Sequence, residues 1–172
     1  PSKIGVVVVS LNYRLAPPEI EFIIRDSDAK VLIAIGDMQP LYSDLRSMIP
    51  ESIHVISTEN ADELGWENTL AQGESTKVIA ELEQHDPYLQ LYTSGTTGNP
   101  KGVVLSHSNL LAEQRISEAN MADRSSPGSV SILCAPLFHI AGAASMVLNV
   151  IAGVHSVLHS TFDPQKIVND IE

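Results

Sequence analysis

The sequence predicts an α/β fold in which helices cover both faces of a mainly parallel sheet. Short apolar runs rich in β-branched residues alternate along the chain with longer segments of helical periodicity. Strands that alternate with helices usually pair in parallel, because each helix returns the chain to the end of the sheet where the strand began. At 172 residues, the chain has about the length of one domain.

Seven strands are expected, each a short apolar run bounded by turn residues or by a helical pattern. The first of them is an apolar run that contains four consecutive valines. The expected strands are Ile4–Val9, Val31–Ile35, Ile53–Ile56, Leu89–Thr93, Val103–Leu105, Ser129–Cys134 and Val154–Leu158.

Helices are expected between and after these strands. Pro17 and Pro18 begin the first one, which runs to about Asp28, because proline suits the first turn of a helix. The other expected helices are Leu41–Met48, Ser75–Glu83, Ser108–Met121, Ile140–Ala152 and Pro164–Glu172. The acidic segment 58–73 has weak periodicity, so we interpret it as a surface excursion in which Trp66 packs against the body of the protein.

The segment Tyr92–Gly102 (YTSGTTGNPKG) is the most informative part of the chain. Its glycines allow the backbone to turn and its N–H groups to approach an anion closely. Its hydroxyl groups add donors, and Lys101 adds a positive charge on a flexible stem. The glycines are Gly95, Gly98 and Gly102, and the hydroxyl residues after Tyr92 are Thr93, Ser94, Thr96 and Thr97.

The expected order of elements around this loop is strand, loop, strand. A Walker A loop instead carries the pattern G-x-x-x-x-G-K-[ST] and leads directly into a helix, and neither glycine spacing in this loop fits that pattern. The alternative without a ligand is a glycine- and threonine-rich hairpin turn. The length of the motif, with Pro100 and Lys101 in place, favours a phosphate-binding loop.

Tyr92–Gly102, together with Val103–Leu110 after it, resembles the signature loop of the acyl-adenylate-forming (AMP-binding) superfamily. That superfamily includes acyl-CoA synthetases, 4-coumarate ligase, firefly luciferase and peptide-synthetase adenylation domains. Two further segments agree with it in order and spacing, Val6–Ile33 and Pro136–Gly142 (PLFHIAG). Together these segments span nearly the whole chain, and they are most similar to an acyl-CoA synthetase.

The resemblance implies that the parent enzyme activates a fatty or aryl carboxylic acid with ATP and then transfers the acyl group to CoA. ATP, Mg²⁺ and CoA are therefore the expected cofactors. Lys101 would neutralise the leaving pyrophosphate, Thr93 would lie near magnesium, and His139 would lie between the carboxylate substrate and the nucleotide. The residues expected to wrap the β- and γ-phosphates are Ser94, Gly95, Thr96, Thr97 and Gly98.

Several alternatives stay open from the sequence. His139 could instead be a core histidine satisfied by a backbone carbonyl. In the resembled enzymes the helix that follows this histidine lines the acyl pocket. Here Gly142, Ala143 and Ala144 would leave room for the acyl chain, and Met146, Val147 and Val150 would supply an apolar wall. A peptide-synthetase adenylation domain shares the loop, and a non-catalytic nucleotide-binding or dimerising module is a further alternative. A homodimer is open for each of these alternatives.

The resemblance also implies that residues 1–172 are a fragment of the large N-terminal domain and that the mobile C-terminal domain is absent. The family's magnesium-binding glutamate, ribose-binding aspartate and C-terminal lysine have no counterpart in this sequence. We therefore expect the fragment to be inactive on its own.

Charge and composition limit the partners. Ten basic and twenty-one acidic residues give a formal net charge of −11, which argues against a nucleic-acid surface. Residues 125–162 contain no charged side chain, but their prolines and histidines favour a buried strand, helix and strand over a membrane span. The one cysteine, Cys134, has no internal disulfide partner and no secretory signal is visible, so a cytoplasmic location is expected.

Overall fold

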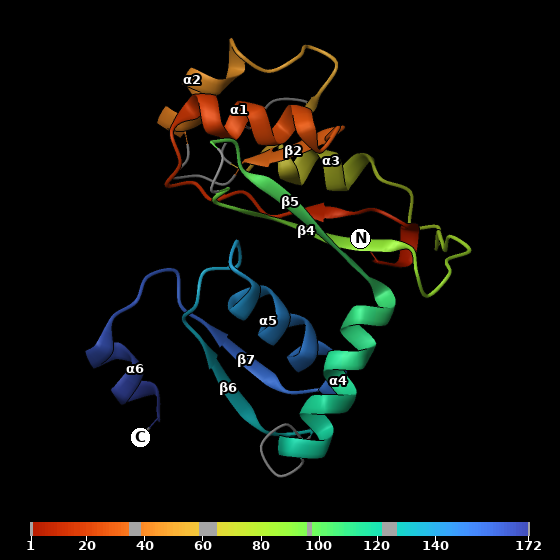
Figure 1. The fold of residues 1–172 in the computed structure, drawn as a ribbon, viewed down its shortest axis with the longest axis vertical. Coiled ribbons are helices and arrows are strands. Elements are labelled where there is room, and N and C mark those ends of the chain that lie inside the picture. The colour runs from red at the N-terminus through yellow and green to blue at the C-terminus, as the bar shows by residue number, and fades with distance from the viewer. Residues whose placement is uncertain (1, 35–38, 59–64, 96–97, 122–126, 172) are drawn as a thin grey trace. The chain divides into compact units, whose positions relative to one another are not determined.

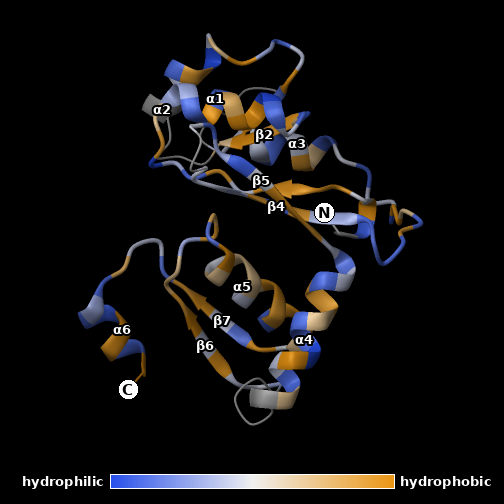
Figure 2. Ribbon diagram, in the orientation of Figure 1, coloured by the Kyte–Doolittle hydropathy of each residue, from blue (hydrophilic) through white to orange (hydrophobic). Residues whose placement is uncertain are grey.

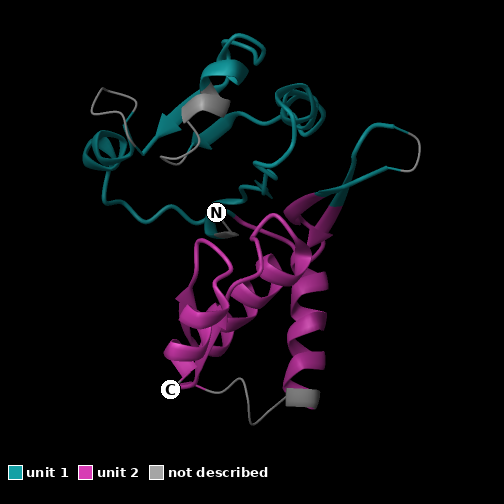
Figure 3. Cartoon of the chain, turned by 90° about the vertical axis from the view of Figure 1, so that its left-hand side faces the viewer, with its two compact units in different colours: residues 1–80, 92–103 teal, residues 81–91, 104–172 magenta. Residues whose placement is uncertain are grey.

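The structure is a computed structural model that describes residues 2–34, 39–58, 65–95, 98–121 and 127–171. The chain divides into two compact units, residues 1–80 with 92–103 and residues 81–91 with 104–172 (Figure 3). Each unit is described by itself. Figure 1 shows the helices and strands along the chain.

In the first unit, helix α1 (Pro17–Asp26) and helix α2 (Gln39–Arg46) accompany the strands β2 (Val31–Ala34) and β3 (His54–Ser57). The two strands pair in parallel, with Val31 opposite His54 and Ala34 opposite Ser57. The parallel pairing expected from the alternation of strands and helices is therefore confirmed here.

The sequence of α1 explains where it begins and which face it buries. Pro17 and Pro18 occupy its first turn, and the Glu19 carboxylate accepts a hydrogen bond of 2.9 Å from the backbone N–H of Ala16. Ile20, Ile23 and Ile24 follow at the three- and four-residue spacing of one helix face, and each is at most 2% exposed. The apolar face of α1 is thus fixed in the interior of the unit.

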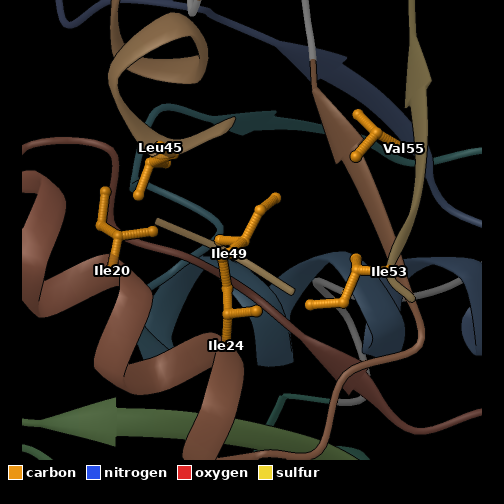
Figure 4. Close-up of a cluster of buried hydrophobic side chains, with 6 residues drawn as sticks. All are labelled: Ile20, Ile24, Leu45, Ile49, Ile53 and Val55. Carbon is orange, nitrogen blue, oxygen red and sulfur yellow. The ribbon is translucent and has the colours of Figure 1, made fainter. Parts of the chain in front are cut away.

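One cluster of buried side chains forms the core of the first unit (Figure 4). Ile20 and Ile24 of α1 lie beside side chains from α2, from the turn after it and from the start of β3. Each such side chain contributes about 1.5–3 kcal/mol when fully buried. The members of the cluster are Ile20, Ile24, Leu45, Ile49, Ile53 and Val55.

The expected strand Ile4–Val9 is too long. A 3₁₀ turn (η1) occupies Ser2–Ile4, and strand β1 is only Val8–Val9. Gly5 has a φ of 70°, in the left-handed region, so the backbone cannot be extended at that residue. The valine run therefore supplies a much shorter strand than its composition indicates.

Helix α3 (Trp66–Gln72) lies in the segment expected as a surface excursion, and none of its residues is buried, so the surface position is confirmed although the helix was not expected. Trp66 is 37% exposed. The expected helix Ser75–Glu83 is wrong, because that segment is not helical. Val78 and Ile79 are 65% and 62% exposed, so a helix here would have no apolar face to bury. The backbone N–H of Ala80 instead donates to the carbonyl of Lys3 at 2.8 Å.

A three-stranded sheet has the order β1-β4-β5, in which β4 is Pro87–Thr93 and β5 is Lys101–Ser106. These two neighbouring strands carry the loop Tyr92–Gly102 between them. Among the described residues, the strands thus form this sheet and two separate parallel pairs, instead of one continuous sheet.

The second unit contains the other parallel pair, β6 (Val130–Leu133) and β7 (His155–Leu158), with Val130 opposite His155. Helix α5 (Ile140–Ala152) packs on both strands and ends at Gly153, which has a left-handed φ of 67°. Helix α4 (His107–Met121) contacts α5, and α6 (Pro164–Ile171) follows β7. Figure 2 shows α5 as mostly apolar and α4 as mixed, as expected for a more and a less buried helix.

None of the helices in the described ranges has the length and hydrophobicity needed to cross a membrane.

Candidate functional site

The loop between β4 and β5 is the candidate site, and its strand, loop, strand context is confirmed. Strand β4 ends at Thr93, and β5 begins at Lys101. Thr93, Ser94 and Gly98 are exposed, so their polar groups are open to a ligand from solvent. Two of the residues expected to bind phosphate, Thr96 and Thr97, lie outside the described residues.

Gly95 and Gly98 have physical reasons to be glycine. A Cβ atom on Gly95 would lie 2.3 Å from the backbone oxygen of Asn99, so the two sides of the loop approach too closely for any side chain. Gly98 has a φ of +113°, a backbone conformation that L side chains rarely adopt. These two glycines allow a tightly closed loop whose backbone N–H groups can face an anion.

Lys101 brings the positive charge to this loop. Its side chain is exposed, and its Cγ lies 3.8 Å from the position of a Cβ on Gly95, so the lysine stem runs beside the loop. No ion pair joins Lys101 to any carboxylate in the part of the chain that the structure describes. Its ammonium group can therefore serve an anionic ligand.

Tyr92, at the entrance of the loop, makes a contact that sequence reasoning missed. Its hydroxyl donates a hydrogen bond of 2.6 Å to the carboxylate of Asp26, the last residue of α1. Burial, and then the Asp26 carboxylate, raise the pKa of the Tyr92 hydroxyl well above its usual value. The hydroxyl consequently stays protonated and remains a donor.

His139 lies immediately before α5, in the second unit, whereas the loop belongs to the first. Its Nδ1 accepts a hydrogen bond of 3.3 Å from the backbone N–H of Ala141, so it acts as the N-cap of the helix. The side chain is exposed. The alternative of a core histidine satisfied by a backbone carbonyl is therefore wrong.

Gly142 does not leave room for an acyl chain. A Cβ at this position would lie 2.4 Å from the carbonyl oxygen of Pro136 and 2.6 Å from that of Ala135. The backbone of the preceding segment therefore fills the space that we expected to be open. Met146 and Val150 on the same helix are exposed, so an apolar wall remains available on α5.

We expect Gly142→Ala to lower the free energy of unfolding by about 1–3 kcal/mol, because the added methyl group forces two backbone carbonyls to move. Urea denaturation of the variant and the wild type measures this difference. Ser145→Ala, an exposed change on the same helix, is the control and should stay within about 0.5 kcal/mol of the wild type. Equal stability of Gly142→Ala and the control would contradict the close packing of α5.

A complete metal site is not formed by the described residues, which contain no group of three or more His, Cys, Asp or Glu side chains that could hold a metal ion. Thr93 offers one exposed hydroxyl at the loop. Magnesium commonly keeps several water ligands and binds through substrate phosphates with only one or two protein oxygens. The single hydroxyl of Thr93 fits such a minor role.

An α/β fold with a hydroxyl-rich loop between two paired strands is the arrangement expected for the AMP-binding superfamily that the sequence resembles. The AMP-binding enzyme family model matches residues 2–172, and the chain belongs to this family.

Relatives and solved structures agree with this assignment. The chain is 31% identical over 168 residues to the long-chain-fatty-acid–CoA ligase FadD13 of Mycobacterium tuberculosis, a match that covers 96% of this chain and 32% of the relative. It is 32% identical over 170 residues to the 2-succinylbenzoate–CoA ligase of Bacillus pumilus, covering 98% of this chain and 32% of the relative. The chain thus spans about a third of the length of these curated relatives.

Among solved structures, the inhibitor-bound N-terminal domain of FACL13 from Mycobacterium tuberculosis superposes with a TM-score of 0.82 at 30% identity. The superposition covers 98% of this chain and 42% of that domain. It confirms the predicted α/β fold class of a partial N-terminal domain of an acyl-CoA ligase.

Proposed function

We propose that residues 1–172 form part of the large N-terminal domain of an AMP-forming acid–thiol ligase that acts on a fatty or aryl acid. The observation that carries the proposal is the closed loop between β4 and β5, with its glycines, hydroxyls and Lys101, in a chain of the AMP-binding enzyme family. The coverage of 42% of the FACL13 domain supports placement within such a domain. The location that we propose for the enzyme is the cytoplasm.

The proposed reaction has two halves. A carboxylate oxygen of the substrate attacks the α-phosphorus of ATP, the bond from that phosphorus to the bridging oxygen breaks, and pyrophosphate leaves with the electron pair. The thiol sulfur of CoA then attacks the acyl carbon of the adenylate and loses its proton, and AMP leaves with the electron pair of the broken C–O bond. The first half needs little acid–base chemistry, so positioning and charge neutralisation determine its rate.

The loop is suited to that first half. The residues that we propose to hold the β- and γ-phosphates are Ser94, Gly95, Thr96, Thr97 and Gly98. Lys101 would neutralise the charge that develops on the leaving pyrophosphate. A magnesium ion would supply further neutralisation of the phosphate oxygens, with the Thr93 hydroxyl beside it.

His139 is proposed to contact the carboxylate substrate. Its Nδ1 accepts the hydrogen bond from Ala141, so a neutral ring carries its proton on Nε2. That N–H can donate to a carboxylate oxygen and orient it for attack on phosphorus. The N-cap geometry therefore fixes both the tautomer and the direction of the donor.

Acid-dependent exchange of pyrophosphate into ATP by the intact protein tests the proposal. A panel of fatty and aryl acids is compared with the corresponding primary alcohols, which cannot form an acyl phosphate bond. We expect exchange with at least one acid, none with its alcohol, and formation of a CoA thioester when CoA is added. Absence of exchange with every acid would refute the proposed activity, and exchange without CoA acylation would indicate a carrier-bound thiol as the acceptor.

Gly95→Ala should lower the rate of this exchange by about ten- to a hundredfold, because the loop must open to relieve the 2.3 Å contact with Asn99 and its donors move away from the phosphates. Exchange at subsaturating ATP measures the loss. Gly73→Ala is the matched control, since its Cβ would come no closer than 3.2 Å to another atom. A Gly95→Ala variant as active as Gly73→Ala would show that closure of the loop is not needed.

A further inference from the structure

We propose that Tyr92 and Asp26 form a tether that positions the phosphate-binding loop, an assignment that rests on the function proposed above. The two residues are 66 positions apart in the chain, and their side chains meet in a hydrogen bond of 2.6 Å. Both belong to the first compact unit, as do the loop and Lys101. The tether therefore joins the entrance of the loop to a helix of the same unit.

Tyr92 is well placed for this role by the alternation of β4. Leu89 and Leu91 are buried on one side of the strand, so Tyr88, Gln90 and Tyr92 lie on the other side. Tyr92 is half-buried and is the last residue but one of the strand. Fixing its side chain fixes the point at which the chain leaves the sheet and enters the loop.

Asp26 is a firm attachment point because it ends α1. The isoleucines of that helix are among the most buried side chains of the described chain, so the helix cannot shift easily. A carboxylate at the C-terminal end of a helix is disfavoured by the helix dipole. Arg25 does not compensate for it, since its guanidinium pairs with Glu21 and with the carbonyl of Met48. The Tyr92 hydroxyl supplies a donor to this carboxylate.

The two ends of the loop, where the chain leaves β4 and where it enters β5, are held in different ways. The end at Lys101 is held by the pairing of β5 with β4. The end at β4 is held by the hydrogen bond of Tyr92 to Asp26, and three residues later Gly95 closely approaches Asn99. Without the tether, Thr93 and Ser94 would lose the side-chain anchor that precedes them, and the loop would need to be ordered by the nucleotide itself.

Hydrogen–deuterium exchange of the intact protein without nucleotide tests the anchor directly. We expect Tyr92→Phe and Asp26→Ala each to raise amide exchange in the loop by about five- to tenfold, and the double variant to add little more. Asp26→Asn keeps an oxygen acceptor and should stay near the wild type. Tyr88→Phe is the matched control, because Tyr88 lies on the same side of β4 and its hydroxyl makes no hydrogen bond to another described residue.

Kinetics of the intact protein test whether the anchor positions the loop for nucleotide. Tyr92→Phe and Asp26→Ala should raise the KM for ATP by about the same factor as the amide exchange, with a nearly unchanged rate at saturating ATP. Asp26→Asn should restore the KM. A general loss of stability would not raise the KM for ATP while leaving the rate at saturating ATP unchanged. Urea denaturation of each variant shows whether its stability is altered.

The tether is overturned if Tyr92→Phe behaves as Tyr88→Phe does in amide exchange or in KM, or if Asp26→Ala leaves the loop unchanged. This failure is distinguishable from failure of the proposed function. A wild-type protein that shows no acid-dependent pyrophosphate exchange refutes the function and, with it, the role in nucleotide binding. If the wild type shows normal pyrophosphate exchange and Tyr92→Phe has an unaltered KM for ATP, the tether is refuted while the proposed function stands.

Discussion

Lys101→Ala is expected to lower acid-dependent pyrophosphate exchange by about 10²–10³-fold, because the segment Tyr92–Gly102 has no other basic side chain to neutralise the leaving pyrophosphate. The lysine is exposed, its stem runs beside Gly95, and no described carboxylate pairs with it. Removing it should therefore change activity much more than stability. Initial exchange rates at saturating acid measure the effect.

Two further variants make this result specific to the charge. Lys101→Met keeps most of the apolar stem and removes the ammonium group, so it should be as inactive as Lys101→Ala. Lys77→Ala removes an exposed lysine outside the loop and should exchange normally. If Lys101→Met kept the wild-type rate, the ammonium group would have no part in the reaction.

Ile24→Ala is expected to lower the free energy of unfolding by about 2–5 kcal/mol, the usual cost of deleting a large side chain from a packed core. Ile24 is 2% exposed and belongs to the cluster that joins α1, α2 and β3. Urea denaturation measures the change. Since α1 also carries Asp26, the variant should in addition increase amide exchange in the loop.

Ile79→Ala is the matched control for that prediction. It deletes the same atoms from a side chain that is 62% exposed, so its stability should stay within about 0.5 kcal/mol of the wild type. An equal loss in both variants would mean that the cluster in Figure 4 does not form the core.

Much of the fold could be predicted from local sequence patterns. Helix α1 has proline in its first turn and isoleucines on one face, and α5 has a long apolar run that ends at a glycine, so both were predicted within a few residues. The segment Ser75–Glu83 has a helix-like composition but buries none of its large apolar side chains. Whether a neighbour covers an apolar face is a tertiary property, and periodicity alone cannot show it.

The candidate site was predictable to a similar extent. The strand, loop, strand order and the position of Lys101 followed from the motif and the apolar runs around it. The partnership of Tyr92 with Asp26 could not be predicted, because 66 residues separate the two side chains and no pattern links them. The close approach of Gly142 to the carbonyls before α5 could not be predicted either. A sequence does not show whether the space beside a glycine is open or occupied by backbone.

The loop between β4 and β5 is proposed to bind the phosphate tail of ATP. A crystal structure of the intact protein with ATP and magnesium tests this binding most directly. We predict phosphate oxygens about 2.7–3.2 Å from donors of the loop, with the ammonium group of Lys101 at the β- or γ-phosphate. A triphosphate bound elsewhere on the protein, with no phosphate touching the loop, would contradict the claim.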